Sequence, residues 1–298
     1  MIEHLKTSMM RALALHIIIQ KKENNLYFPG EDGSNQRILW ASETATNAES
    51  QLSWLTNACE NNKTLRALWP HKMWTDARRQ ARRWNAQEAQ LPRTVDYPEP
   101  TIQTIGVGGA VTGRHQSCHI FDDLISLKAA NSATIMAETI QWFTASRALL
   151  DHPINSVQFL IGTRWAVFDL WGDIIKNDPS VDTIVRSIIE EGIPIFPEYF
   201  SVETIAQLEK EFGALFSLIY MNSAYDPALV DFDVGAVRNF TMEAGQILFT
   251  PDDRDAQLTT AAQKQGFIPP PQEAPQGARL TPDLMRVLFA RGERSKMT

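Results

Sequence analysis

The sequence has little cysteine and no long apolar run. Its two cysteines, Cys59 and Cys118, stand far apart and do not form the pattern of a disulfide scaffold. They fit a reducing compartment in which both remain free thiols. No stretch of 18 apolar residues occurs, so we expect no segment that spans a membrane.

The chain also lacks an excess of positive charge. It carries 28 lysines and arginines against 35 acidic residues, for a formal net charge of -7. This balance argues against nonspecific coating of nucleic acid, although a local basic face remains compatible with it. Hydrophobic residues make up 44% and charged residues 21% of the chain, as in a globular protein of one large or two small domains.

Strand and helix patterns alternate along most of the chain. Apolar runs predict strands at 37–42, 101–107, 117–121, 156–162 and 183–192. Helical spacing predicts helices at 7–22, 43–60, 72–93, 131–150, 163–176 and 201–222. The alternation predicts an α/β fold with a mainly parallel sheet flanked by helices. We expect this domain to cover 1–240, and the remainder, 241–298 with its proline-rich stretch, to be a linker or flexible tail.

Two adjacent carboxylates, Asp122 and Asp123, follow the strand in "CHIFDD". Acids at the carboxyl end of a parallel strand point into the crevice where open α/β sheets bind ligands. Their repulsion falls when a divalent cation lies beside them, as Mg²⁺ does in P-loop ATPases, where the first acid holds the metal and the next polarises water. The alternative is an ordinary strand end followed by a helix cap, with Asp123 or Ser126 as the capping residue.

A phosphate loop of the form G-x-x-x-x-G-K-[ST] should lie upstream, and the sequence shows only its end. In "EHLKTSMM", Lys6 and Thr7 open a predicted helix and supply the ammonium for phosphate and the hydroxyl for Mg²⁺. The first glycine and its strand are missing, and Leu5 takes the place of the second glycine. The alternative is a plain helix start.

A third segment, "FLIGTRW" (159–165), reads as a strand that ends in polar residues. Thr163 suits a sensor of the γ-phosphate or its water, and Arg164 suits either transition-state charge or an ion pair with an acid. The alternative is a strand-to-helix turn with a capping threonine.

Together these segments resemble the large terminase subunit of tailed bacteriophages, the motor that packages viral DNA. The resemblance runs from about residue 3 to 240 and rests on the order "GVGGAVTGRH…IFDD…IGTRW…FPEYFS…YMN". It implies a P-loop ATPase fold, ATP and Mg²⁺ as cofactors, and ATP hydrolysis that translocates double-stranded DNA into a capsid. It also implies partners: the portal protein, the small terminase subunit and further copies in a ring. The implied location is the host cytoplasm, transiently on the procapsid.

The resemblance implies a role for each matching residue. His4, Leu5, Lys6 and Thr7 would bind ATP, and Thr7 and Asp122 would hold the metal. Asp123 stands where many of these motors have a catalytic glutamate, and its side chain is one methylene shorter. Thr163 would match the motif that couples hydrolysis to movement. The glycine-rich segment 106–115 would lie near the active edge of the sheet, with its backbone close to a ligand, unless it is a plain flexible loop.

The sequence departs from the family in two ways. The family has a strand and loop residues before Lys6, including an arginine, and the printed sequence begins inside that loop. A family nuclease domain is also not expected, because about 58 residues after position 240 are too few for it. Two alternatives therefore stand: a truncated, non-catalytic remnant that binds DNA or another packaging subunit, and a different nucleic-acid-dependent ATPase such as a helicase.

A basic stretch at 72–93 predicts a DNA-contacting helix. Arg78 and Arg82, and likewise Arg79 and Arg83, are four residues apart, with Lys72, Trp74 and Trp84 nearby. Such residues suit sequence-independent contacts to the phosphate backbone. The alternative is a solvated face whose charges pair with acids elsewhere, for example Glu190, Glu191 or Glu211.

Overall fold

The computed structural model describes residues 3–110, 113–152, 154–166, 168–213, 215–223, 240–243 and 246–249. The chain divides into two compact units, Met1–Leu229 and Val230–Thr298. In the second unit the described residues form an antiparallel hairpin of β8 (Phe240–Glu243) and β9 (Gln246–Phe249). The proline-rich stretch of the expected tail, 267–283, lies outside the described residues.

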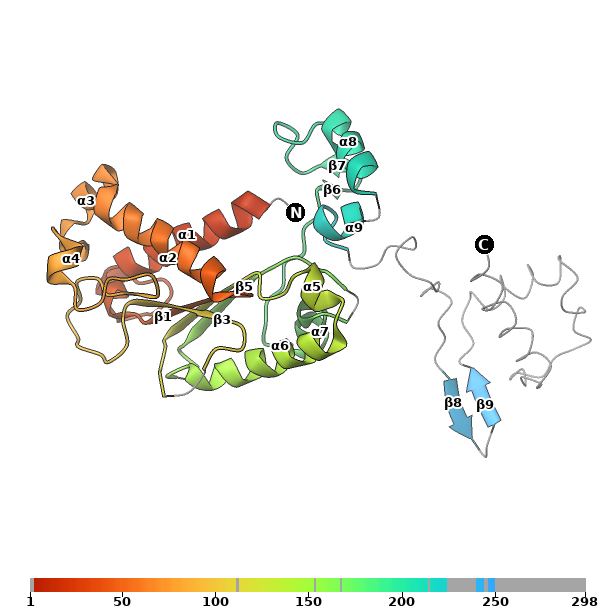
Figure 1. The fold of residues 1–298 in the computed structure, drawn as a ribbon, viewed down its shortest axis with the longest axis horizontal. Coiled ribbons are helices and arrows are strands. Elements are labelled where there is room, and N and C mark those ends of the chain that lie inside the picture. The colour runs from red at the N-terminus through yellow and green to blue at the C-terminus, as the bar shows by residue number, and fades with distance from the viewer. Residues whose placement is uncertain are drawn as a thin grey trace, which may run out of the picture. The chain divides into compact units, whose positions relative to one another are not determined.

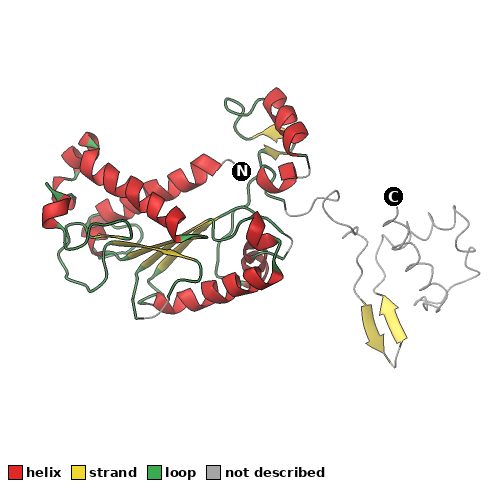
Figure 2. Ribbon diagram, viewed as in Figure 1, coloured by secondary structure: helices red, strands yellow, loops and turns green. Residues whose placement is uncertain are grey.

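The first unit alternates strands and helices (Figures 1 and 2). Its strands are β1 (Ile38–Ser42), β2 (Glu88–Ala89), β3 (Ile102–Gly106), β4 (Cys118–Asp122), β5 (Val157–Ile161), β6 (Ile189–Glu190) and β7 (Ile193–Pro194). Its α-helices are α1 (Glu3–Ile19), α2 (Ala45–Asn61), α3 (Lys63–Leu68), α4 (Ala77–Gln80), α5 (Leu127–Ala130), α6 (Ala133–Ser146), α7 (Leu170–Asn177), α8 (Val202–Phe212) and α9 (Leu215–Ile219). No described helix has the length and apolar character needed to cross a membrane.

The main sheet has the strand order β2-β3-β1-β4-β5. Strands β3, β1, β4 and β5 are parallel to their neighbours, and only the short edge strand β2 is antiparallel. This arrangement confirms the predicted α/β class and the mainly parallel sheet. Because Phe121 pairs with Ala41 of β1 and with Leu160 of β5, the carboxyl ends of these three strands lie level at one edge.

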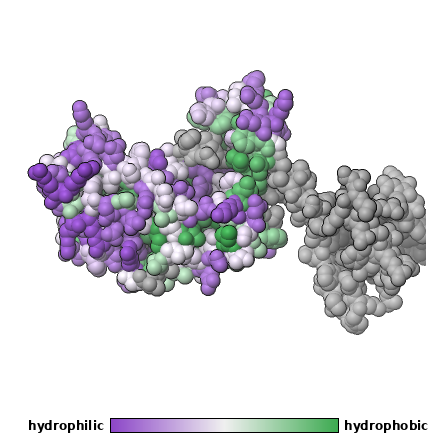
Figure 3. Space-filling model, viewed as in Figure 1, coloured by the Kyte–Doolittle hydropathy of each residue, from purple (hydrophilic) through white to green (hydrophobic). Residues whose placement is uncertain are grey.

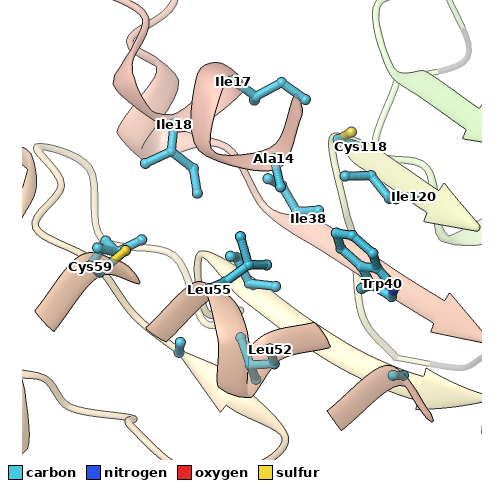
Figure 4. Packing of buried hydrophobic residues seen from close by; sticks show 14 of the residues in the cluster. Ala14, Ile17, Ile18, Ile38, Trp40, Leu52, Leu55, Cys59, Cys118 and Ile120 are labelled. Carbon is cyan, nitrogen blue, oxygen red and sulfur yellow. The ribbon is translucent and has the colours of Figure 1, made fainter. Parts of the chain in front are cut away.

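Helices cover both faces of the sheet, which explains why every residue of β1 and β4 is buried. On one face α1 and α2 pack against the strands, as Figure 4 shows for Ala14, Leu52 and Trp40. On the opposite face α5, α6 and α7 pack against Leu39 and Phe121. Alternate side chains of each strand therefore point into two separate hydrophobic cores, one on each face of the sheet.

The helix predicted at 72–93 is wrong. Only Ala77–Gln80 is helical, and Ala81 adopts an extended backbone with φ -76° and ψ 138°. The chain then enters β2, so Arg82 and Arg83 do not share a helical face with the two earlier arginines. Tertiary pairing of β2 with β3 has overridden the local helical spacing.

Two further predictions hold only in part. The expected strand at 183–192 is limited to Ile189–Glu190. In the described structure no strand pairs with the residues before it, and Ile184 is accordingly 85% exposed. The expected helix at 201–222 begins after its Ser201 cap as predicted, but it is interrupted at Gly213, where φ is +53°. Only glycine adopts such a backbone at low cost, which accounts for the break.

Candidate active site

Helix α1 carries Lys6 and Thr7 to the carboxyl edge of the sheet. Farther along the helix, Ala14, Ile17 and Ile18 are fully buried in the core that α1 shares with the sheet. This packing fixes the helix axis. Its first turns therefore lie beside the ends of β4 and β5, where they meet residues more than 100 positions away.

Lys6 joins the two strand ends. Its Nζ donates a hydrogen bond of 2.6 Å to the Thr163 hydroxyl and lies 3.3 Å from Oδ1 of Asp123. The lysine is only 3% exposed. A buried ammonium is costly to desolvate, and the contacts with Thr163 and Asp123 offset part of that cost.

Thr7 bonds to the neighbouring acid. Its hydroxyl donates to Oδ1 of Asp122 at 3.1 Å, and Asp122 is 3% exposed. Burial, and then the adjacent charge of Asp123, raise the pKa of Asp122 to about 6. The hydrogen bond from Thr7 and the charge of Lys6 oppose that shift only in part. A further cation beside this carboxylate would favour its ionised form.

Asp123 has an unusual backbone. Its φ is +48°, a left-handed conformation that is uncommon outside glycine, although asparagine and aspartate adopt it more often than other residues. Both of its peptide groups are held, since its N–H donates to the Ile161 carbonyl and its carbonyl accepts from the Glu43 N–H, each at 3.0 Å. Its side chain is 42% exposed, so one oxygen meets Lys6 while the rest faces solvent. Backbone strain of this kind tends to occur at functional sites.

Thr163 is positioned by the turn that follows β5. A Cβ at Gly162 would lie 2.3 Å from the Trp171 ring, so the chain approaches that ring closely and only glycine fits there. After Thr163, Arg164 donates from Nε to the fully buried Asp169 at 2.9 Å. Arg164 therefore pairs with an acid, which is one of the two roles expected of it.

The oxygen donors fit a magnesium ion. Thr7 and Asp122 offer a hydroxyl and a carboxylate that already lie 3.1 Å apart. Mg²⁺ binds through one or two protein oxygens and takes its other ligands from water and substrate phosphates. Among the described residues, no group of three or more His, Cys, Asp and Glu side chains is placed to hold a metal. The pair thus suits a metal that arrives with a phosphate ligand.

The remaining predicted site residues lie as follows. His4 and Leu5 belong to the first turn of α1, which is already helical at Glu3, and their side chains lie outside the described residues. The glycine-rich segment begins at Gly106, the last residue of β3, at the same carboxyl edge but two strands from β4. Gly109 offers its carbonyl to Trp142 at 2.8 Å, which ties this loop to α6.

The four arginines differ in their surroundings. Arg79, Arg82 and Arg83 lie beside Asp76, Asp96 and Glu88, respectively. Arg78 is exposed, and no ion pair in the described part of the chain includes it. Figure 3 shows hydrophilic side chains over the surface around α3 and α4. The charges are thus partly paired, with acids other than those considered from sequence.

Three neighbours of these arginines contact other parts of the protein. Lys72 is 2% exposed and pairs with Asp32, so its predicted contact with DNA is wrong. The indole of Trp74 donates to the Gln90 carbonyl, and that of Trp84 donates to Glu60. These rings hold the surrounding loops in place.

Glu43 is a residue at this edge that sequence reasoning missed. It directly follows β1, and its carboxylate accepts from the Ser126 hydroxyl at 2.5 Å. The signal was present, because "ILWASE" has the same form as "CHIFDD", an apolar strand that ends in an acid. The predicted helix at 43–60 includes this glutamate, whereas α2 begins only at Ala45.

Comparison with known proteins adds no family to this geometry. No model of a known protein family matches the chain, and no protein with a curated description matches it.

Proposed function

We propose that the chain binds Mg·ATP at the ends of β4 and β5 and hydrolyses it, as the motor portion of a viral DNA-packaging terminase. One observation carries the proposal. Lys6 and Thr7 contact Thr163, Asp123 and Asp122, which lie 115 to 157 positions away in sequence. A lysine, a hydroxyl and paired carboxylates are the groups that P-loop ATPases use for phosphate and Mg²⁺.

Each residue has a defined task under this proposal. Lys6 neutralises phosphate charge, and its present hydrogen bond to Thr163 marks where a phosphate oxygen would take over. Thr7 and Asp122 would hold Mg²⁺. The metal supplies positive charge that stabilises the phosphates during transfer. Thr163 gains or loses its bond to Lys6 as phosphate leaves or arrives, which is how it would sense the nucleotide state.

The proposed reaction is an in-line attack by water on the γ-phosphorus. A new oxygen–phosphorus bond forms, and the bond to the bridging oxygen breaks with its electron pair left on ADP. The proton from water passes to a carboxylate at this edge. The resemblance to terminases assigns that role to Asp123, which would orient the water.

The proposed work is translocation of double-stranded DNA into a capsid. Sequence-independent gripping requires basic groups that face solvent, and Arg78 is the best such group in the 78–83 stretch. The proposed partners are the portal protein, the small terminase subunit and other copies in a ring on the procapsid in the host cytoplasm. A neighbouring copy would supply an arginine to the transition state.

One alternative is favoured by Leu5. This residue stands where the phosphate loop needs a glycine that permits close backbone approach. The alternative is a non-catalytic remnant that binds DNA or a packaging subunit through its surface. It predicts DNA or subunit binding that is indifferent to Lys6.

The test is steady-state ATP hydrolysis with and without double-stranded DNA, on the parent chain and on Lys6→Ala and Asp122→Ala. We expect DNA-stimulated release of phosphate that falls at least about 100-fold in both variants. Lys72→Ala is the matched control, since Lys72 is also buried beside an acid but belongs to another cluster. Hydrolysis that is absent, or unchanged in both site variants, would falsify the proposal.

A further inference from the structure

We infer that Glu43, rather than Asp123, is the carboxylate that orients the attacking water and accepts its proton. This inference rests on the proposed ATPase function. It adds a residue that follows β1 to a site whose other members come from α1 and from the ends of β4 and β5.

The strand register places Glu43 beside the site. Ala41 pairs with Phe121 on the neighbouring parallel strand, so two positions farther Glu43 lies level with Asp123. The hydrogen bond of 3.0 Å from the Glu43 N–H to the Asp123 carbonyl shows that the two strand ends stay paired there. Neighbouring strands are about 4.8 Å apart, so the glutamate side chain starts within reach of the same space.

The other two carboxylates are already engaged. Asp122 accepts from Thr7 and is the proposed metal ligand. Asp123 faces Lys6 at 3.3 Å, and its short side chain extends from a left-handed backbone held at both peptide groups. Turning Asp123 toward a water would break its contact with the lysine. The geometry therefore gives Asp123 the task of holding Lys6.

Glu43 is available for a different task. It is half-buried, and no ion pair among the described residues includes it. Its carboxylate accepts from the Ser126 hydroxyl at 2.5 Å, which holds it next to the turn at 123–126. The longer side chain also supplies the methylene that Asp123 lacks.

The proposed step balances as follows. One O–H bond of water breaks, and its proton goes to the Glu43 carboxylate. The water oxygen bonds to the γ-phosphorus, and the bond from that phosphorus to the bridging oxygen breaks with its electron pair on ADP. The products are ADP, inorganic phosphate and a protonated carboxyl group that later releases its proton to solvent.

The test compares two matched amide substitutions, Glu43→Gln and Asp123→Asn, in the full chain. We expect Glu43→Gln to lower single-turnover hydrolysis by at least about 100-fold, as for loss of a general base. We expect Asp123→Asn to lower it by less than about tenfold. Equal losses, or a larger loss in Asp123→Asn, overturn the inference.

A binding measurement gives a second readout that needs no hydrolysis. Glu43 lies near the expected γ-phosphate, so Glu43→Gln should strengthen binding of the Mg²⁺ complex of β,γ-imido-ATP by about fourfold. That is the size of one unit-charge repulsion a few ångströms away in a water-like medium. Binding of ADP should not change. An equal change for both nucleotides, or none for either, contradicts the inference.

Ser126→Ala distinguishes a chemical role of the Glu43 carboxylate from a structural role in which Glu43 only supports the turn at 123–126. The amide introduced by Glu43→Gln can still accept from Ser126, so a loss confined to that variant is a loss of the charge. Ser126→Ala instead removes the hydrogen bond and keeps the carboxylate. We expect Ser126→Ala to hydrolyse ATP at a rate within about fivefold of the parent, because one hydrogen bond of about 1 kcal/mol is lost.

If the parent chain binds no imido-ATP, the proposed function fails. If it binds and the substitutions behave alike, only this inference fails.

Discussion

The ammonium group of Lys6 lies 2.6 Å from the hydroxyl of Thr163, although the two residues are 157 positions apart. This bond connects the first turn of α1 to the end of β5. It also occupies the lysine in the absence of nucleotide. Binding of a phosphate would therefore require an exchange of partners, and the following predictions test that exchange and the site around it.

Thr163→Val should alter nucleotide binding more than stability. Valine has the shape of threonine but cannot accept from Lys6, so the ammonium keeps only Asp123 as a partner. Because the resting state loses a competitor for phosphate, we expect Mg·ATP to bind about two- to tenfold more tightly. Fluorescence titration measures this. Thr163→Ser, which keeps the hydroxyl, is the control, and weaker binding in Thr163→Val alone would contradict the exchange.

Asp122→Asn should stabilise the metal-free protein at neutral pH. The folded pKa of about 6 lies above the ordinary value of 3.8, so ionisation of Asp122 opposes folding. The penalty is absent below pH 3.8, grows as pH rises toward 6, and then stays constant. We expect Asp122→Asn to gain about 1–3 kcal/mol in the free energy of unfolding at about pH 7.5.

Urea denaturation at about pH 7.5 and about pH 4 checks this difference. The gain should largely disappear at the lower pH, where the parent carboxyl is protonated when folded. A variant that is less stable than the parent at the higher pH would show that the charged form is already favoured there. Added Mg·ATP should stabilise the parent but not Asp122→Asn.

His119 should make the fold sensitive to acid. Burial in β4 lowers its pKa from 6.5 to about 3, so the folded protein keeps it neutral while the unfolded chain takes up a proton. The contribution of neutral His119 to the free energy of unfolding is fully present above pH 6.5 and is lost as the pH falls below that value. At about pH 5 the cost is about 2 kcal/mol. Denaturation of the parent and of His119→Gln at neutral pH and at about pH 5 measures it, and equal losses in both proteins count against the assignment.

Arg78→Ala should weaken binding to double-stranded DNA. This side chain is exposed and has no ion pair within the described structure, whereas Arg82 pairs with Asp96. We expect a severalfold loss at low salt and a salt dependence whose slope falls by about one for Arg78→Ala. Arg82→Ala, the matched control, should lose less affinity for double-stranded DNA. Filter binding across salt concentrations provides both values, and identical behaviour of the two variants would rule out this contact.

The fold and the core of the site were largely predictable from sequence. Apolar residues marked β1, β3, β4 and β5, and the signal was strongest in β1 and β4, which are buried throughout because helices cover both faces of the sheet. The acids at the end of β4 and the Lys6–Thr7 pair were found by chemical type. Their contacts follow from the rule that parallel strands bring their carboxyl ends to one edge.

The parts that sequence missed depend on tertiary contacts. Arg78 and Arg82 have helical spacing, but β2 pairs with β3 and the helix ends at Gln80. Lys72 looked like a surface charge, yet it is buried against Asp32 from a distant loop. Glu43 was hidden because a strand end and a helix start overlap at that position. Local patterns carry no signal for which of two overlapping roles the fold selects.

Equilibrium binding of radiolabelled ATP, with Mg²⁺, to the parent chain and to Lys6→Ala tests the central claim most directly. Among the described residues, Lys6 is the one that links α1 to both Asp123 and Thr163. We expect saturable binding of one nucleotide per chain, and at least about tenfold weaker binding in Lys6→Ala, as for loss of a charged hydrogen bond. Binding that is absent from the parent, or identical in the two proteins, would show that this lysine is not there to receive a phosphate.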